Sequence, residues 1–246
     1  MRLIIKKSLL IAAAAVLTAA ALSASFVFSE AAPDAQRYEV MGVDVSDYQG
    51  DIDWDILEAQ GVRFAFIKAT EGSGYTDASF QRNITSAEGS GIKTSAYHFF
   101  SFDSAGATQA DNFIAAIGDA KLDMPPAVDI EYYGDKALHK PTREETREIL
   151  GELLDRLEQH YGVKPVIYTT LPAYLRYVRR DFPDYPLWIR SVDAEPDLIG
   201  WTFWQYSGEG ILDGYYGDEK YIDLNVYNGT KEEFEKEFLA SDETEE

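Results

Sequence analysis

The stretch Met124-Pro-Pro-Ala-Val-Asp-Ile-Glu-Tyr-Tyr133 combines a short apolar run with two carboxylates separated by one residue. Successive side chains of a β-strand alternate between its two faces, so Asp129 and Glu131 point the same way and Ile130 points the opposite way. Two neighbouring carboxyl groups repel each other, which raises the pKa of one of them. Because shifted carboxyl pairs cluster at active sites, the stretch indicates a buried strand that ends in a functional site.

Short apolar runs alternate with helical patterns on both sides of this stretch. Asp53 is expected to cap one helix, and Thr142 with Glu145 has the spacing of a capping box for the longest helix, which Gly162 ends. Thr230 and Glu233 have the same spacing before the last helix. The predicted strands are 40–45, 62–69, 93–100, the Asp129 strand, 164–169, 187–190, 202–206 and 221–225, and the predicted helices are 53–60, 78–88, 104–117, 142–161 and the one after 230.

Alternating strands and helices favour a parallel sheet with right-handed crossover connections. About eight strands in one domain fit an α/β barrel of the TIM type better than an open sheet. Little helix is predicted between the last three strands, so the barrel is expected to be irregular, with fewer helices than strands. An open doubly wound sheet is the alternative, but no glycine-rich phosphate loop follows the first strand.

The first 31 residues are typical of an export signal. Three basic residues occur within the first seven positions, and Leu9–Ala24 is almost entirely apolar. We expect a cleaved signal peptide at 1–31 and a bacterial protein secreted to the cell exterior, and a membrane anchor through residues 8–28 is the alternative. The expected remainder is a linker at 32–38, a catalytic barrel at 39–240 and a disordered acidic tail at 241–246.

Composition narrows the range of partners and chemistries. The chain has 246 residues, no cysteine and a formal net charge of −21. The absence of cysteine excludes disulfides, a thiol nucleophile and thiolate metal ligands. The strong negative charge argues against nucleic acid as a partner, because phosphate binding needs a basic surface. We expect a soluble monomer that self-repulsion keeps apart from its copies, without a stable membrane partner unless the N-terminal segment is retained.

The carboxyl ends of the predicted strands collect acids and aromatic residues. In a β/α barrel these ends form the active-site face. Carboxylates from three different strands would therefore meet at one mouth, where flat aromatic rings and hydrogen-bond acceptors suit a sugar. The expected catalytic residues are Asp44, Asp129, Glu131 and Asp223, and the expected substrate contacts are Glu71, Tyr97, Tyr133, Tyr168, Trp188, Trp204 and Gln205.

Most of these residues also have a purely structural interpretation. Asp44 and Asp223 each fit a turn carboxylate that accepts backbone amides. Lys68 with Glu71 fits a structural ion pair as well as a catalytic role, and His98 is expected to be structural. Aromatic residues in strands mostly belong to the core. The pair Asp129 and Glu131 is the exception, because two acids on one face after an apolar strand favour function.

Six ordered motifs resemble those of glycoside hydrolase family 25, the lysozymes or N-acetylmuramidases. The first is Gly42-Val-Asp-Val-Ser-Asp-Tyr-Gln-Gly50 with Ile52-Asp-Trp54, and the resemblance covers about 41–238. No catalytic motif is visibly broken, and no wall-binding repeat is found in the sequence. The remaining motifs are Phe66-Ile-Lys-Ala-Thr-Glu-Gly72, Tyr97-His-Phe-Phe100, Val128-Asp-Ile-Glu131, Trp204-Gln-Tyr206 and Ile222-Asp-Leu-Asn225.

The resemblance implies a flattened, irregular barrel that hydrolyses the β-1,4 bond between N-acetylmuramic acid and N-acetylglucosamine in peptidoglycan. Glu131 matches the family's general acid and Asp129 its partner, while Asp44 and Asp223 match two further carboxylates. We expect Asp129 to stay ionised and to keep Glu131 protonated near neutral pH, with no cofactor and no metal. Substrate-assisted attack is the favoured route, and direct nucleophilic or water-base roles for Asp44 or Asp223 stay open.

Two other classes of protein fit the same residues. One is a non-catalytic protein that binds glycans or peptidoglycan through the aromatic mouth. The other is a metal-dependent hydrolase with the four carboxylates as hard oxygen ligands. The sequence disfavours the metal enzyme, because no histidine pair at ligand spacing accompanies the acids.

Overall fold

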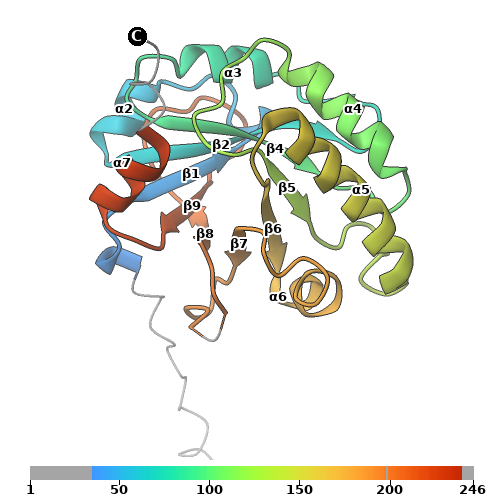
Figure 1. Ribbon diagram of the computed structural model, residues 1–246. Coiled ribbons are helices and arrows are strands. Elements are labelled where there is room, and N and C mark those ends of the chain that lie inside the picture. Colours follow the sequence, from blue (N-terminus) through green and yellow to red (C-terminus); the bar gives the residue numbers. More distant parts are fainter. Residues whose placement is uncertain (1–34, 198, 240–246) are drawn as a thin grey trace, which may run out of the picture. The chain divides into compact units, whose positions relative to one another are not determined.

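Eight strands close into a barrel in the computed structural model, which describes residues 35–197 and 199–239 (Figure 1). Around the barrel the strands follow the order β1, β9, β8, β7, β6, β5, β4, β2, and pairing of β1 with β2 closes the ring. The two-residue strand β3 pairs with the end of β2. The bounds are β1 Met41–Val45, β2 Val62–Glu71, β3 Tyr75–Thr76, β4 Lys93–Phe99, β5 Ala127–Ile130, β6 Val166–Thr170, β7 Leu187–Arg190, β8 Phe203–Gly210 and β9 Ile222–Tyr227.

The predicted α/β barrel is therefore confirmed, but the expectation of a parallel sheet is wrong for one strand. From β1 through β2, β4, β5, β6, β7 and β8 the neighbours run parallel. Strand β9 runs antiparallel to both β8 and β1. The physical reason is the connection between β8 and β9, which contains no crossover helix and returns the chain along the same edge. The amino end of β9 thus lies beside the carboxyl ends of the other strands.

Helices cover one part of the barrel more completely than the other. The α-helices are α2 Trp54–Ala59, α3 Phe80–Ser86, α4 Gly106–Ile117, α5 Arg143–Tyr161, α6 Leu171–Ala173 and α7 Lys231–Leu239, and the shorter helical segments are η1 Ala35–Arg37, η2 Asp47–Gln49 and η3 Tyr174–Val178. Figure 1 shows α2 to α5 along one side of the strands, whereas β7, β8 and β9 follow one another without a helix. The predicted irregularity is confirmed. The helical turns of α6 and η3 were not predicted.

Local signals fixed the main helix ends. The side chain of Asp53 accepts the N–H of Ile56 at the start of α2, and Thr142 accepts the N–H of Glu145 at the start of α5. Helix α5 ends at Gly162, whose φ of 72° is in the left-handed region that glycine adopts most readily. These ends were predicted because each depends on residues within one turn of the chain.

Three apolar clusters hold the layers together. The largest lies between the strands and α2 to α5, and it includes Ile130 on the outer face of β5. A second cluster fills the barrel with aromatic rings from β2, β7 and β8 and from α7, including Phe66, Trp188 and Phe234. The third covers the outside of β7 to β9 with Trp201 and Trp204, where no long helix is present in the described residues.

The N-terminal segment and the acidic tail are not part of this description. The predicted signal peptide or anchor at 1–31 lies outside the described residues, and so do residues 32–34 of the predicted linker at 32–38 and the predicted tail at 241–246. Within 35–197 and 199–239, no helix is both long and apolar enough to cross a membrane.

Candidate active site

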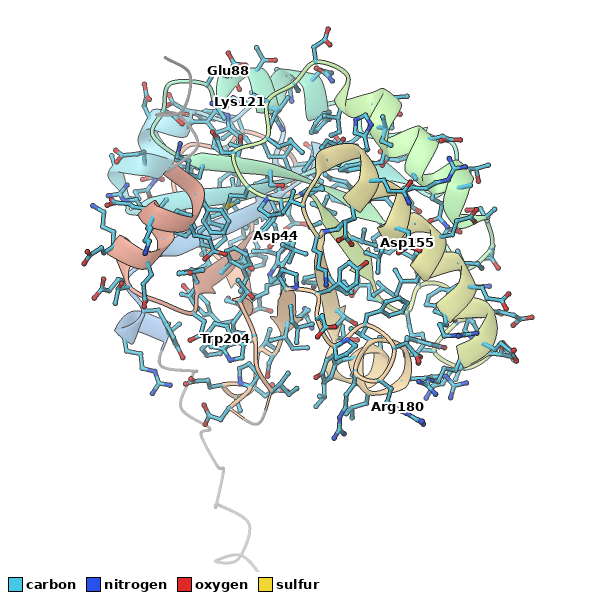
Figure 2. The ribbon with its side chains drawn as sticks, in the orientation of Figure 1. Asp44, Glu88, Lys121, Asp155, Arg180 and Trp204 are labelled. Carbon is cyan, nitrogen blue, oxygen red and sulfur yellow. The ribbon has the colours of Figure 1, made fainter. Side chains whose placement is uncertain are left out.

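The mouth of the barrel brings the four predicted carboxylates together. Asp44 lies in β1, Asp129 in β5 and Asp223 in β9, while Glu131 directly follows β5. Asp44 appears inside the ring of strands in Figure 2. Electrostatic coupling links Asp44 with Asp223 and Asp129, and Glu131 with Asp129 and Asp223. Three strands that are far apart in the sequence therefore contribute to one acidic site.

Asp44 and Asp223 face each other across two antiparallel strands. They are register partners in the β1–β9 pair, and their carboxyl groups interact by a hydrogen bond. Burial and then the charge of Asp223 raise the pKa of Asp44 well above its usual value, and amide hydrogen bonds oppose this rise. Burial also raises the pKa of Asp223, although nearby Arg190 opposes it. One proton is thus more stable on Asp44 than on Asp223.

A chain of buried polar groups holds Asp44 in place. Its Oδ2 atom accepts a hydrogen bond from Gln205 Nε2 at 2.9 Å and another from Asn225 Nδ2 at 2.8 Å. The hydroxyl of Tyr168 donates to Gln205 Oε1 at 2.9 Å, and the indole nitrogen of Trp188 donates to Asn225 Oδ1 at 2.7 Å. Four strands, β6 to β9, therefore support one carboxyl group on β1.

Asp129 and Glu131 form the second carboxyl pair. Asp129 is 7% exposed, and its Oδ1 atom has no hydrogen-bond partner. Burial, followed by the charges of Glu131 and Asp44, raises the pKa of Asp129 well above its usual value. Burial also raises the pKa of Glu131, but Arg190 and Lys68 oppose this rise. The free protein consequently favours the shared proton on Asp129, which differs from the sequence-based expectation of an ionised Asp129.

Two cations lie beside the four acids. Arg190 ends β7 and acts on both Glu131 and Asp223. A Cβ atom added at Gly208 would lie 3.2 Å from Asp223 Oδ1 and 3.6 Å from Arg190 Nη2, so the backbone of β8 packs closely behind both groups. Lys68 forms an ion pair with Glu71 at 3.1 Å, and its charge lowers the pKa of Asp129. The two cations reduce the repulsion between the acids.

Four of the predicted substrate contacts lie at or near the mouth. Tyr97 is half-buried, and burial together with the charges of Asp44 and Asp129 raises its pKa. Tyr168 is buried and holds Gln205, which itself holds Asp44. Glu71 is exposed beside Lys68. Gln205 therefore contacts Asp44 directly, and Tyr168 supports Asp44 through Gln205.

Tyr133 is fixed by the loop that follows β4. Its hydroxyl accepts the N–H of Phe102 at 3.0 Å and donates to Asp103 at 3.0 Å. Its ring packs against Phe99 with 5.7 Å between the centroids. This side chain is half-buried, so one part of the ring stays open to solvent next to the end of β5.

The two predicted tryptophan contacts are both buried away from solvent. Trp188 is 1% exposed and stacks on Phe66 inside the barrel, with 4.3 Å between the ring centroids. Trp204 is on the opposite face of β8 from Gln205 and packs with Tyr38 and Trp201 outside the barrel. Figure 2 shows Trp204 apart from Asp44, near the outer edge of the ring. The structure therefore does not bring Trp204 to the mouth, and it places Trp188 beneath it.

Sequence reasoning gave no role to two polar residues that the fold places beside the acids, Arg190 and Asn225, or to the buried acid Asp77 in the loop after β3. Arg190 and Asn225 were recognised only as strand-end residues, although alternation puts Asn225 on the same face as Asp223. Asp77 is 3% exposed and accepts the N–H groups of Asp47 and Ser79 at 3.0 and 2.9 Å. No local pattern marks Asp77, because the loop that holds it is arranged by contacts distant in the sequence.

His98 has the structural role that was expected. It is fully buried between Thr70 Oγ1 at 2.7 Å and Gln109 Oε1 at 3.0 Å. Burial lowers its pKa to about 4, so its ring is neutral near neutral pH. It lies on the opposite face of β4 from Tyr97, away from the acids.

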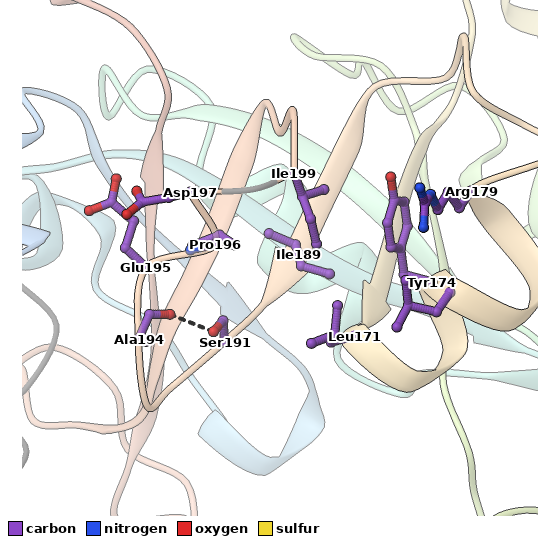
Figure 3. A pocket seen from close by; sticks show the side chains of 11 residues that line it. Leu171, Tyr174, Arg179, Ile189, Ser191, Ala194, Glu195, Pro196, Asp197 and Ile199 are labelled. Carbon is purple, nitrogen blue, oxygen red and sulfur yellow. Dashed lines mark hydrogen bonds between the residues drawn. The ribbon is translucent and has the colours of Figure 1, made fainter.

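Two hollows differ in their chemistry. One of about 330 Å³ opens at the mouth and is lined by Asp44 and Asp223 together with Tyr48 and Tyr221. Another of about 700 Å³ lies beside β7, where Leu171, Tyr174 and Ile189 form part of its wall (Figure 3). None of the four predicted carboxylates lines this larger hollow. Asp44 and Asp223 therefore line the hollow at the mouth, whereas Asp129 and Glu131 line neither of these two hollows.

Within the described ranges 35–197 and 199–239, no group of three or more His, Cys, Asp or Glu side chains has a geometry that could hold a metal ion. The chemistry that this arrangement supports is proton transfer between paired carboxyl groups. A family model described as "Glycosyl hydrolases family 25" matches residues 43–215, more than half of the chain. The chain belongs to glycosyl hydrolase family 25. It is a glycosidase.

Individual proteins support this membership. A family 25 glycosyl hydrolase structure from Bacillus anthracis is 49% identical, covers 82% of this chain and 94% of its own, and superposes with a TM-score of 0.77. Lysozyme M1 of Streptomyces globisporus is 34% identical over 204 residues, which are 78% of this chain and 68% of that protein. The uncharacterised protein YegX of Escherichia coli O157:H7 is 36% identical over 206 residues, or 80% of this chain and 73% of that one.

Proposed function

We propose that this family 25 glycosidase is a lysozyme that hydrolyses the β-1,4 bond between N-acetylmuramic acid and N-acetylglucosamine in bacterial peptidoglycan. The observation that carries the proposal is the buried pair of Asp129 and Glu131 at the mouth, whose pKa values are both raised. Similarity to lysozyme M1 supports the substrate. The protein acts outside the cell as a monomer.

Glu131 is the general acid in this proposal. Glycosidases need one protonated carboxyl for the leaving oxygen and an anion for the oxocarbenium-like transition state. Asp129 and Glu131 share one proton, so their apparent pKa values belong to the pair. Positive charge that develops on the sugar stabilises the anionic form of Asp129, and the proton then resides on Glu131. General-acid catalysis of this kind raises the reaction rate by roughly 10²–10⁴-fold.

The 2-acetamido group of the substrate supplies the nucleophile in the route that we favour. Asp129 orients this group or stabilises its positive charge, because its Oδ1 atom is buried without a protein partner. Tyr97 and Tyr133 line the sugar path beside the two acids. Asp223, held next to Arg190, provides the negative charge on the opposite side of the mouth.

The test of this proposal is the substitution Glu131→Gln, which keeps the shape of the side chain and removes the acidic proton. We expect the release of new reducing ends from purified peptidoglycan to fall by roughly 10²–10⁴-fold. Glu88→Gln is the matched control, because Glu88 is an exposed glutamate at the helical edge, far from Asp44 in Figure 2. Mass spectrometry of the products should show muramic acid at the reducing end.

Other outcomes of these experiments would indicate a different mechanism or activity. Wild-type rates in Glu131→Gln would exclude Glu131 as the acid. Glucosamine at the reducing end would indicate a glucosaminidase. Binding of muropeptides by the wild type without new reducing ends would indicate a non-catalytic glycan-binding protein.

A further inference from the structure

The partners of the two amide groups that contact Asp44 indicate how each amide is oriented. The indole N–H of Trp188 can only donate, so Asn225 must present its oxygen to Trp188 and its NH₂ group to Asp44. The hydroxyl of Tyr168 occupies the oxygen of Gln205, which leaves the NH₂ group of Gln205 for Asp44. All four supporting side chains are at least nine-tenths buried.

This arrangement decides which oxygen of Asp44 can carry a proton. Oδ2 accepts two N–H groups, so a proton there would point at another donor. With the amides in these orientations, a proton on Asp44 lies on Oδ1. The carboxyl of Asp223 is a hydrogen-bonding partner of Asp44, and the two residues are directly opposite in the β1–β9 register. Because Oδ2 already accepts two N–H groups, we assign this bond to Oδ1.

The charges around Asp44 favour its neutral form. Asp223 on β9, Asp129 on β5, Tyr97 on β4 and Tyr168 on β6 face it, and none of these groups is a cation. Among the described residues, the ion pairs include none with Asp44. Asp223 differs, since Arg190 stabilises its charge while Glu219 acts in the opposite sense.

We propose that Asp44 is held as a neutral carboxylic acid that donates its Oδ1 proton to the Asp223 carboxylate, with Gln205 and Asn225 as the positioning residues that enforce this direction. The proposal rests on the glycosidase function proposed above and deepens it. The raised pKa of Asp44, caused by burial and by Asp223, agrees with it. Asp44 is then a positioning residue, and Asp223 is the anion that faces the sugar.

The decisive comparison is Asp44→Asn with Asp44→Ala. The two amide donors force the introduced amide to place its oxygen where Oδ2 was and its NH₂ group toward Asp223, which reproduces the hydrogen bond of the neutral acid. We expect Asp44→Ala to lower kcat by roughly 10²-fold, the typical effect of losing one organised donor. We expect Asp44→Asn to recover most of that loss at unchanged KM. Equal loss of kcat in both variants would overturn the proposal.

An NMR titration tests the protonation of Asp44 without an activity measurement. It does not depend on whether Asp44→Ala folds. In protein labelled with ¹³C at aspartate carboxyl groups, the NMR resonance that Asp44→Asn removes belongs to Asp44. We expect this resonance to titrate well above the ordinary aspartate value of about 3.9. Titration at or below that value would overturn the proposal. Gln205→Glu should move the resonance, whereas Asn228→Asp, an amide that donates to the carbonyl of Trp201 outside the mouth, should not.

These results can be separated from a failure of the proposed function. A wild-type protein that releases no reducing ends contradicts the glycosidase proposal, but the NMR titration still tests the proton position. A wild-type protein that is active, together with an Asp44→Asn variant as inactive as Asp44→Ala, contradicts the neutral Asp44 and leaves the function intact.

Discussion

Arg190 lowers the proton affinity of two carboxyl groups at the mouth, Glu131 and Asp223, from a single position. Its charge opposes the rise in pKa that burial causes at both Glu131 and Asp223. The proposed mechanism needs Glu131 protonated and Asp223 ionised, so both limbs of the expected pH–rate profile depend on groups that Arg190 influences. After burial, the largest effect on the pKa of Glu131 and on that of Asp223 thus comes from a residue without an acidic or nucleophilic role.

Replacing Arg190 by glutamine should move the whole pH profile of kcat/KM to higher pH. Loss of the cation raises the pKa of Glu131, so the proton needed for catalysis is retained to higher pH. The pKa of Asp223 rises too, so the acidic limb moves in the same direction. Initial rates of reducing-end release between about pH 4 and 9 measure this shift.

The matched control is Arg63→Gln, because Arg63 pairs with Glu58 at 2.6 Å away from the acids. Its profile should coincide with that of the wild type. A profile of Arg190→Gln that is unshifted, or shifted to lower pH, would show that Arg190 does not act on the catalytic carboxyl groups.

At the scale of elements, the close contact of α4 with α5 depends on a glycine. A Cβ atom added at Gly106 would lie 2.2 Å from the carbonyl oxygen of Ile149 and 2.8 Å from the nitrogen of Leu153. Both atoms are backbone, so they cannot move aside as a flexible side chain can. The first turn of α4 therefore packs directly on the backbone of α5.

Gly106→Ala should lower the free energy of unfolding by roughly 1–3 kcal/mol, the usual cost of overpacking. Gly151 in α5 offers a control for which the free energy of unfolding should change in the opposite direction. A Cβ atom there would be 3.7 Å from the ring of Phe182, an ordinary contact. Gly151→Ala should stabilise the protein by about 0.5–1 kcal/mol through the higher helix propensity of alanine. Urea unfolding of both variants measures the difference, and an unchanged Gly106→Ala would mean that the two helices can separate without cost.

At the scale of the whole molecule, charge governs the approach to the substrate. The chain carries a formal net charge of −21. Bacterial walls with anionic polymers repel such a protein at low ionic strength, where the Debye length is about 30 Å at 0.01 M. The repulsion is largely screened at 0.15 M, where this length is about 8 Å.

Salt should therefore raise the rate at which the protein clears wall suspensions that carry anionic polymers. We expect an increase of several-fold between about 0.01 and 0.15 M salt, in line with screening of long-range charge. Walls stripped of these polymers supply the control, because their clearance should change little. Equal salt effects on both preparations would indicate that salt acts on the acidic mouth of the enzyme and not on its approach to the wall.

Several strand faces and helix ends of this protein can be predicted from short stretches of its sequence. Strand alternation placed Asp129 and Glu131 on one face, and the caps at Asp53 and Thr142 fixed two helix starts within a turn of each residue. The same alternation contained the signal that Trp204 cannot face the mouth together with its neighbour Gln205. Trp188 does point inward, but depth along the barrel axis is a tertiary property, and it lies below Arg190 in the core.

The sequence by itself determined the alternating elements, the acidic strand ends and the direction in which the Asp129 and Glu131 side chains point, since these depend on local geometry. Only the tertiary structure decided that β9 runs antiparallel, that Asp44 meets Asp223, and that Gln205 and Asn225 aim their amides at one oxygen. Those contacts join residues more than 150 positions apart. Closure of the barrel brings them together, and burial there gives each carboxyl its proton affinity.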